Sequence, residues 1–514
     1  MPIKFNLKSI LWLTFLVGTA IGLFLQFTYH KFLNFDTLAY INIAELYAND
    51  NLKDAVNACW SPMYSWILAP CKLVGLPLLE CCYVLNFVAA AVCFNLLLMM
   101  GRRFLKNELW YAVFGFYTLF LLMYFAMSTL TPDLLAAAFS LWFIRLITKQ
   151  HFFNSKTRPL LAGVAAAGMY FAKSYNFVAV HLFLLAFLLI PWLTSEKVLF
   201  KRKFKQLGKL YLIFLSLCLP WITVISGKED KATFSNTGRF THNLVSPDYK
   251  GYYPIYNKIH PPPENAYFFM IDPTNTLDEY EWSPFESRRN FQHQLSLIWD
   301  SIRNFYLALD NSGVKGALLL ASLIILYLNR KDYKLEIPHG LRRIIAFTIL
   351  YPLFYLPIFI TDRYVYVCIF LFHLILFYFI QQASTLVTKK YQPQILIGLL
   401  VLSLIPFGLL AKKKLSISSG EYGYYKEFSK QLPKFSFLTS QYIAADPASA
   451  LECVQLCYRV QCTYYATWMD KKYESLKNNR IRYYIAKTKV DFPFLQLAKE
   501  ISVKGSTFYI YEVQ

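Results

Sequence analysis

The sequence predicts an α-helical protein that crosses a membrane about eleven times and ends in a small α/β domain outside the membrane. Composition, apolar runs and the placement of charges predict this class. Of the 514 residues, 56% are hydrophobic and only 16% are charged, whereas soluble domains carry about a quarter charged residues. Long apolar runs recur, with Lys and Arg in short clusters between them. The formal charge of +21 therefore does not indicate a nucleic-acid binder, whose basic residues would form a patch on a soluble domain.

The first apolar run extends from Ser9 to Thr28, which is long enough to span a bilayer. No small-residue cleavage site follows it, so we expect a retained first helix rather than a signal peptide. The further runs lie near 76–100, 109–128, 133–148, 160–172, 175–193, 209–226, 313–329, 343–360, 364–380 and 394–410. The pair at 160–193 fits two short spans, or one span with a re-entrant piece.

The clusters of Lys and Arg orient these runs. They follow the second and fourth runs, precede the seventh and the last, and separate the eighth from the ninth. With a cytoplasmic N-terminus, every cluster falls on the cytoplasmic side, as the positive-inside rule requires. We therefore expect a transmembrane domain, residues 1–410, with outer loops at about 29–75 and 227–312, and an outward-facing domain, residues 411–514.

The outward-facing domain alternates between extended and helical patterns. Aromatic-rich extended stretches lie at Phe435–Tyr442, Arg480–Lys487 and Thr507–Val513, and more helical stretches lie at 446–458 and 493–500. This alternation predicts a small α/β domain.

Asp36, in the first outer loop, is the first candidate site residue. It lies about eight residues beyond the first span, so its carboxylate would sit near the outer membrane face. The spacing of Tyr40, Ile43, Ala44 and Tyr47 predicts an amphipathic helix that lies on the membrane interface. The structural alternative is that Asp36 caps this helix.

Three more charged residues stand at the outward ends of spans. Asp133 opens the fourth span, where the helix dipole stabilises an acid whatever its function. Lys173 interrupts an apolar stretch, so we expect it to pair with a partner or to snorkel to the headgroups. Arg363 lies in a short outward turn, where it either pairs with Asp362 or binds a phosphate with its planar fork.

The long outer loop carries Arg288, Arg289 and His293 close behind a run of acids and aromatics. A charged run is by default a solvated face, and the aromatic residues stack on sugars or pack the loop. No glycine-rich phosphate loop, His-Glu-x-x-His or Cys-x-x-Cys occurs. Cys59, Cys453, Cys457 and Cys462 are expected to face outward, with a disulfide among them left open.

These motifs resemble the GT-C superfamily of integral membrane glycosyltransferases. The chain is similar to its bacterial protein O-mannosyltransferase-like and lipid A aminoarabinose transferase-like groups. The shared features are Asp36 with the following Tyr-x-x-x-Ala segment, the turn Trp60-Ser61-Pro62-Met63-Tyr64, Thr131-Pro132-Asp133 and Asp362-Arg363-Tyr364. Thr37 follows Asp36, where the mannosyltransferases carry adjacent Asp-Glu.

The resemblance implies a polyprenyl-phosphate-linked sugar donor used on the outer face of the membrane. Asp36 would act as the base on an acceptor hydroxyl in one inverting displacement. Lys173, Arg363 and Tyr364 would bind the donor phosphate, whose leaving charge needs cations. Asp133 would orient the acceptor or bind a metal. No metal is expected to be obligatory, and a divalent ion is left open.

A glycan, lipid or protein would accept the sugar, membrane lipids would surround the chain, and nucleic acid is not expected as a partner. The implied location is the bacterial inner membrane, with the C-terminal domain periplasmic or extracellular. Two alternatives remain. A polysaccharide polymerase or ligase would rely on Arg288, Arg289 and His293, and a lipid-linked sugar transporter would concentrate ionisable residues at mid-span.

Overall fold

The computed structural model describes residues 7–29, 33–193, 199–248, 259–273, 281–310, 314–330, 335–386, 424–468 and 471–514. The chain forms two compact units, each assembled from separate stretches. The first comprises Met1–Leu23, Tyr83–Thr223 and Gln292–Lys413, and the second comprises Phe24–Cys82, Val224–Phe291 and Lys414–Gln514. The predicted boundary at residue 410 lies outside the described residues and stays a prediction.

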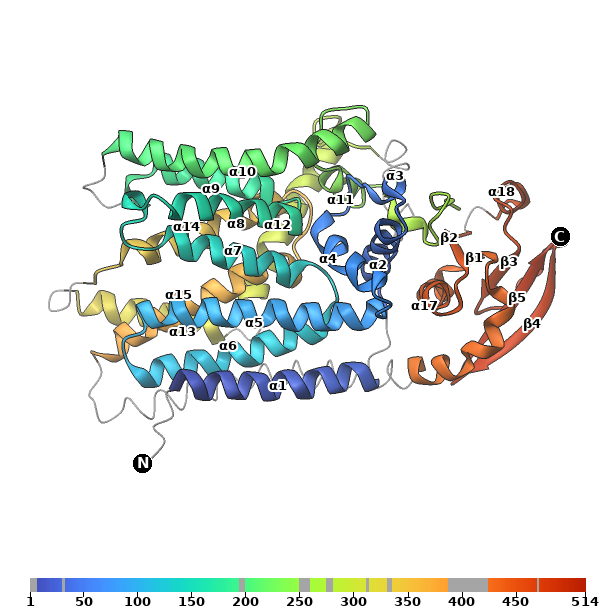
Figure 1. Ribbon diagram of the computed structural model, residues 1–514, viewed down its shortest axis with the longest axis horizontal. Helices are drawn as coiled ribbons and strands as arrows, with labels where there is room; N and C mark the ends of the chain where they lie inside the picture. Colours follow the sequence, from blue (N-terminus) through green and yellow to red (C-terminus); the bar gives the residue numbers. More distant parts are fainter. Residues whose placement is uncertain are drawn as a thin grey trace. The chain divides into compact units, whose positions relative to one another are not determined.

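Helices build the first unit, and most of them run side by side (Figure 1). The helices that lie in it wholly or for most of their length are α1 (Leu7–Tyr29), α5 (Leu78–Phe104), α6 (Glu108–Ser128), α7 (Asp133–Ile147), α8 (Arg158–Ala172), α9 (Asn176–Leu189), α10 (Phe200–Lys228), α12 (Arg288–Leu309), α13 (Val314–Leu328), α14 (His339–Leu350) and α15 (Tyr366–Ser384). Within the described residues, five helices are long and apolar enough to cross a membrane. The chain is therefore a polytopic membrane protein, as predicted.

Three predicted spans need comment, and a fourth, at 394–410, lies outside the described residues. The segment 160–193 forms two short helices, α8 and α9. The run at 343–360 is not one helix: α14 ends at Leu350, and the 3-10 turn η6 (Tyr351–Tyr355) follows it. Pro352 and Pro357 explain this, because proline lacks the backbone donor and disfavours a helical residue before it.

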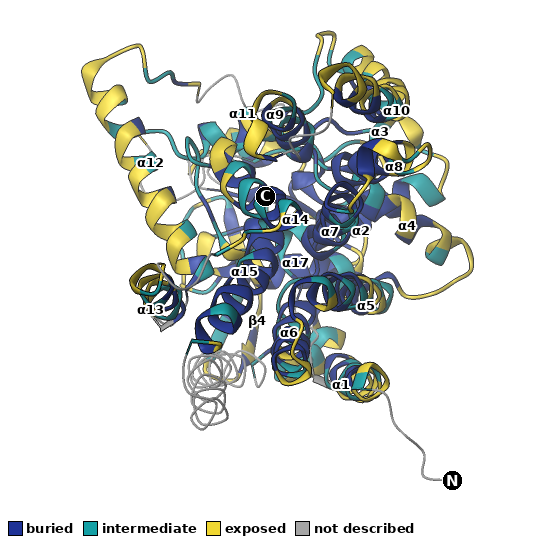
Figure 2. Cartoon of the chain, turned by 90° about the vertical axis from the view of Figure 1, so that its left-hand side faces the viewer, coloured by how far each residue is buried: buried dark blue, intermediate teal, exposed yellow. Residues whose placement is uncertain are grey.

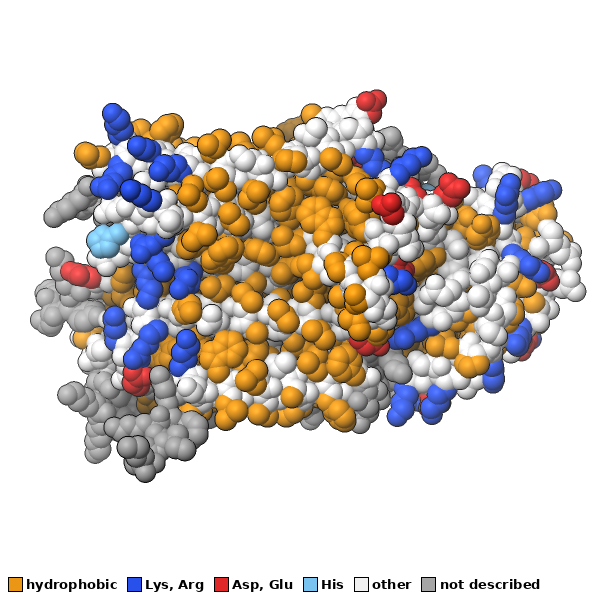
Figure 3. Space-filling view, viewed as in Figure 1, with side chains coloured by type: hydrophobic (Ala, Val, Ile, Leu, Met, Phe, Trp, Pro, Cys, Tyr) orange, Lys and Arg blue, Asp and Glu red, His pale blue; other side chains and the backbone are white. Residues whose placement is uncertain are grey.

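Lys and Arg side chains gather at one end of the first unit, whereas apolar side chains cover its helices (Figure 3). The charges of Arg145 and Arg158 act on that of Arg103. Arg343 lies at the same end, where it donates to the carbonyl of Leu193 at 2.8 Å. Arg103, Arg158 and Arg343 come from clusters that the sequence assigns to the cytoplasmic side.

The second unit contains short helices and a five-stranded sheet. Its helical elements include α2 (Phe35–Ala48), α3 (Leu52–Ala55), α4 (Pro62–Leu73), α11 (Thr237–Asn243), the 3-10 turns η4 (Phe269–Ile271) and η9 (Leu432–Leu438), α17 (Ala450–Val460) and α18 (Tyr473–Asn478). The strands are β1 (Tyr442–Ala445), β2 (Thr463–Thr467), β3 (Tyr483–Ala486), β4 (Leu495–Val503) and β5 (Ser506–Val513), in the order β2-β1-β3-β5-β4. β1 runs parallel to β2 and β3, and β5 is antiparallel to β3 and β4.

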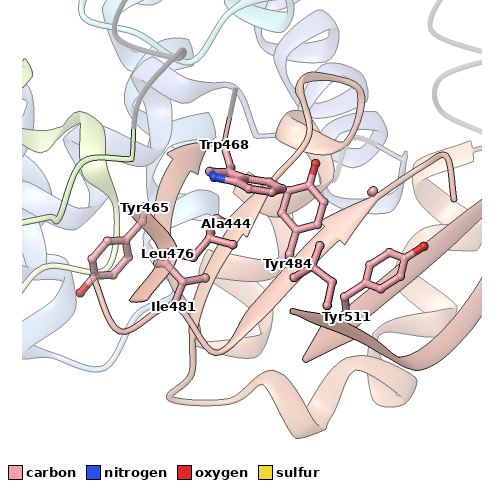
Figure 4. Packing of buried hydrophobic residues seen from close by; sticks show 9 residues of the cluster. Ala444, Tyr465, Trp468, Leu476, Ile481, Tyr484 and Tyr511 are labelled. Carbon is pink, nitrogen blue, oxygen red and sulfur yellow. The ribbon is translucent and has the colours of Figure 1, made fainter. Parts of the chain in front are cut away.

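Buried aromatic side chains form the core of this α/β part (Figure 4). Trp468 meets Tyr484 edge to face, with ring centroids 5.1 Å apart, and its indole N–H donates to the carbonyl of Lys472. Tyr511, from β5, belongs to the same cluster. The predicted small α/β domain is therefore confirmed as a fold.

Two local predictions in this region were wrong. The stretch 493–500, predicted as helical, contributes to β4, because β4 pairs along its length with β5. Its Leu, Gln, Ala, Lys and Glu residues favour helices in isolation, so tertiary pairing overrides local propensity. The first half of Phe435–Tyr442, predicted as extended, belongs to η9, and the strand β1 begins only at Tyr442.

All ten cysteines are free thiols. Burial raises the pKa of Cys453 and Cys457 well above the ordinary thiol value. The structure describes Cys59, Cys453, Cys457 and Cys462, and all four are buried. No disulfide joins them.

Candidate functional site

An acid and a lysine from successive helices form a buried ion pair in the first unit. The ammonium of Lys173 contacts the carboxylate of Asp133, and their side chains are only 19% and 4% exposed. Thr131 donates its hydroxyl to the second carboxylate oxygen of Asp133 at 2.6 Å. The expectation that Lys173 pairs with a partner is confirmed, and the alternative that it snorkels freely is wrong.

Close packing of α7 on α8 brings these two side chains together. α7 begins at Asp133, directly after Pro132, and α8 ends just before Lys173, whose backbone is extended. A Cβ at Gly168 of α8 would lie 2.3 Å from a ring carbon of Phe139 in α7. Gly168 therefore permits an approach between the helices that a larger residue would prevent.

Three stacked tyrosine rings line the lysine. Tyr175 stacks on Tyr355 at a centroid distance of 3.5 Å, and Tyr355 stacks on Tyr364 at 5.1 Å. The ammonium of Lys173 lies 3.9 Å from the ring centroid of Tyr364 and 5.8 Å from that of Tyr355. A desolvated ammonium over an aromatic face gains electrostatic attraction, so the stack stabilises the charge as Asp133 does.

Arg363 adds a second cation to this cluster. It lies in the 3-10 turn η7 (Asp362–Val365), with its guanidinium carbon 5.2 Å from the ring centroid of Tyr364. Its charge also acts on the carboxylate of Asp133. Asp133, Lys173, Arg363 and Tyr364, which the sequence singled out separately, thus lie together.

Tyr175 and Tyr355 were not recognised from the sequence. The signal available was the run of tyrosines from Tyr351 to Tyr366, which recurs through two 3-10 turns that periodicity does not reveal. Tyr175 also donates its hydroxyl to the carbonyl of Tyr351. The tyrosines therefore link the α8–α9 turn to η6 and η7.

Asp36 belongs to the second unit, where it is half-buried in the first turn of α2. The helix cap is Asn34, whose side-chain oxygen accepts from the amide and the hydroxyl of Thr37, both at 2.7 Å. The alternative that Asp36 caps this helix is therefore wrong. Its carboxylate is not needed for the capping bond.

The amphipathic character predicted for this helix is also wrong. Residues 37–46 are all buried, because other segments of the second unit cover the helix. Tyr40, for example, meets Trp60 and Tyr64 edge to face at centroid distances of 5.2 and 5.4 Å. The tertiary structure buries the polar side of α2 as well, so it is not an interfacial helix.

A second acid, Asp272, accompanies Asp36 in this unit. Two hydrogen bonds hold the turn before it, from Asn57 to the carbonyl of Ile271 at 2.5 Å and from the Trp60 indole to that of Met270 at 2.9 Å. Burial and then the charge of Asp272, with a smaller effect of Asp36, raise the pKa of the Cys59 thiol well above its ordinary value. Asp272 was missed because it lies more than 200 residues from Asp36, with no motif around it.

Comparison with solved structures identifies the fold. The computed structure matches a crystal structure of ArnT from Cupriavidus metallidurans bound to undecaprenyl phosphate, with a TM-score of 0.56 and 11% sequence identity. The match covers 98% of this chain and 97% of that one. This chain has the ArnT fold. The apo form of the same protein matches with a TM-score of 0.45, at 10% identity and 98% coverage of both chains.

No protein-family model matches the sequence. No curated protein matches it either. The ArnT likeness therefore rests on structure alone, and it confirms the predicted fold of a polytopic helical membrane protein with a small α/β domain.

The loop candidates of the alternative polymerase function lie at the start of α12. Arg289 forms an ion pair with Asp248 at 3.0 Å and donates to the carbonyl of Pro247 at 3.0 Å. Both charged side chains are well exposed, so the pair contributes little stability. Arg288 and His293 occupy the same two helical turns.

Trp282, which precedes these residues, is buried. Its ring stacks on His242 at a centroid distance of 4.4 Å. The sequence left open whether the loop aromatics stack on sugars or pack the loop, and Trp282 packs the loop. Within the described parts of the chain, no group of three or more His, Cys, Asp or Glu side chains could hold a metal ion.

Proposed function

We propose that this chain is a membrane glycosyltransferase that moves a sugar from a polyprenyl-phosphate-linked donor to an acceptor hydroxyl. The observation that carries the proposal is the cluster of Lys173, Arg363 and Asp133 beside stacked tyrosines. Its setting in the ArnT fold supports the same class of enzyme, because the matched ArnT structure holds undecaprenyl phosphate.

In the proposed reaction, Asp36 removes the proton from the acceptor hydroxyl. The oxygen then attacks the anomeric carbon as the bond to the phosphate breaks, with inversion at that carbon. The phosphate leaves with the electron pair and needs no protonating acid. Asp36 suits the role of base because it stands half-buried in a first helical turn whose cap is another residue.

The cations stabilise the charge that grows on the leaving phosphate. Arg363 takes the larger part, because its fork engages two phosphate oxygens at once. The charge of Lys173 is already balanced by Asp133. We therefore assign Lys173 and Asp133 to fixing the tyrosine stack and the position of the donor phosphate, with Asp133 still a candidate for contact with the acceptor or a metal.

The test uses the full-length protein in nanodiscs, with radiolabelled sugars on undecaprenyl phosphate as donors. Asp36→Asn should lower transfer about a hundredfold or more while the binding of undecaprenyl phosphate is kept. Arg363→Ala should weaken that binding about tenfold or more. Arg102→Ala, which removes an exposed arginine paired with Glu108, is the matched control and should change neither.

Unchanged transfer by Asp36→Asn would refute the assigned base. If Arg289→Ala abolished transfer while Asp36→Asn did not, the polymerase or ligase alternative would replace this proposal. Transfer that survives metal chelation would support the expectation that no metal is obligatory.

A further inference from the structure

α12 (Arg288–Leu309) differs from the other long helices in direction and in exposure. The helices of the bundle are seen end-on in Figure 2, whereas α12 is seen along its length, with exposed residues along most of it. It therefore lies across the direction of the bundle. A helix that crosses a bundle of membrane spans in this way lies along the plane of the bilayer.

The residues of α12 divide by chemistry around the helix. Gln294, Ser301 and Ala308 recur every seven residues and are buried. Gln294 donates to the carbonyl of Pro357 at 2.8 Å, which ties this side to the first unit. One face of α12 is therefore docked on the protein.

A second face of α12 is apolar and exposed. It consists of residues three or four apart, each between 46% and 69% exposed, and is called the apolar stripe: Phe291, Leu295, Trp299, Ile302 and Tyr306. A continuous row of large apolar side chains is costly in water and marks a surface that another apolar phase covers. Trp and Tyr in such a row are typical of the membrane–water interface.

The apolar stripe continues into α13. Asp310 joins the two helices, because it accepts from the hydroxyl of Tyr306 at 3.3 Å and from the amide of Gly316 at 2.8 Å. A Cβ at Gly316 would lie 2.9 Å from that same carboxylate, so glycine allows Asp310 to approach the start of α13 closely. α13, a shorter apolar helix, then exposes Leu320, Leu323, Ile324 and Tyr327.

Arginines flank the apolar stripe. Arg288 opens the helix and Arg303 lies one position beyond Ile302, and both are exposed. Long basic side chains at the border of an apolar face extend along it and place their charge among lipid headgroups. Asp300 is the one acid of α12, so the exposed side of the helix is net basic.

We propose that α12 is an interfacial helix that inserts its apolar stripe among lipid chains and binds the phosphates of anionic phospholipids through Arg288 and Arg303. A lipid surface fits better than a protein partner because the stripe is followed by further exposed apolar side chains on α13 and because its flanking charges are complementary to anionic headgroups. The proposal does not depend on the transfer reaction.

Spin labelling of the full-length protein in nanodiscs tests the position of the helix. Cys71 and Cys81, the two cysteines that are not fully buried, are first changed to Ser. Labels on Leu295→Cys and Ser296→Cys then sample neighbouring positions on the two sides of the helix, and Leu219→Cys, at an exposed position of the candidate span α10, is the bilayer reference. We expect the label at 295 to match the oxygen accessibility of the reference, and the label at 296 to be several-fold more accessible to a water-soluble nickel chelate.

Equal chelate accessibility at 295 and 296 would overturn the proposal, because the stripe would then lie in water. Low accessibility of 295 to both oxygen and chelate would also overturn it, because a protein would then cover the stripe. Unfolding would also make the two labels equally accessible to the chelate, so each labelled variant must first elute as a monodisperse peak like that of the unmodified protein.

Native mass spectrometry tests whether Arg288 and Arg303 bind anionic phospholipids. Protein released from phosphatidylglycerol nanodiscs should retain bound phosphatidylglycerol, and the double variant Arg288→Gln/Arg303→Gln should lose most of it. Arg102→Gln, at an exposed arginine outside α12, should retain it. Equal retention by the double variant, or equal retention of phosphatidylcholine by the unmodified protein, would refute a headgroup site for anionic lipids.

Discussion

Removing the positive charge of Lys173 should destabilise the protein strongly. Lys173→Met keeps the length of the side chain but leaves the carboxylate of Asp133, which is only 4% exposed, without its ion-pair partner. Breaking one side of a buried pair costs about 3–5 kcal/mol. Because Lys173 is itself 19% exposed and the charge of Arg363 also acts on Asp133, we expect the lower end, about 3 kcal/mol.

A double-mutant cycle measures this effect in detergent by chemical denaturation. The cycle compares Lys173→Met, Asp133→Asn and the double variant with the unmodified protein. The double variant has no buried charge to leave unpaired, so it should recover about 1–3 kcal/mol relative to the sum of the single losses. Lys205→Met, at an exposed lysine of α10, is the control and should cost little.

If the loss in the double variant equalled the sum of the two single losses within about 0.5 kcal/mol, the coupling between these side chains would be refuted. A loss by Lys205→Met as large as that by Lys173→Met would show that the effect is one of net charge rather than of the pair.

Three further predictions follow from the packing. Gly168→Ala should lower the free energy of unfolding by about 1–3 kcal/mol in the same denaturation assay, because the added Cβ would meet Phe139. Gly238 has open space around it, so the control Gly238→Ala should leave stability nearly unchanged. Asn34→Ala should cost about 1 kcal/mol through loss of the cap, whereas Asp36→Asn keeps the cap and should cost less. Equal costs would contradict this. Cys457 should resist iodoacetamide until the protein unfolds, and labelling of the folded protein at neutral pH would contradict this. Because burial raises the pKa of this thiol in the folded state, the free energy of unfolding should fall as the pH rises above the thiol pKa of the unfolded chain, about 8.5.

Much of the helical architecture could be predicted because apolar runs of span length have few alternatives in a bilayer. The runs that became α5, α6 and α10 are of this kind. The clusters around Arg103 and Arg343 likewise fall at one end of the bundle, where charge placement had predicted a common side.

The C-terminal strands and the break after α14 could be predicted less well. The stretch that forms β4 consists of good helix formers, and only its pairing with β5 makes it a strand. In α2, local spacing suggested one polar side, but packing by Trp60 and Tyr64 buries the helix all round.

By itself, the sequence determined that the chain is a polytopic membrane protein and which charges stand out against apolar surroundings, because both follow from the cost of polar groups in a bilayer. It singled out Asp133, Lys173 and Arg363 one at a time. Only the tertiary structure decided that Lys173 pairs with Asp133 and lies over Tyr364, because side chains from separate helices meet through packing that linear spacing does not encode. The same holds for α12. The sequence placed its charges in a loop, whereas the structure places them beside the exposed apolar face of a helix whose other face contacts the protein.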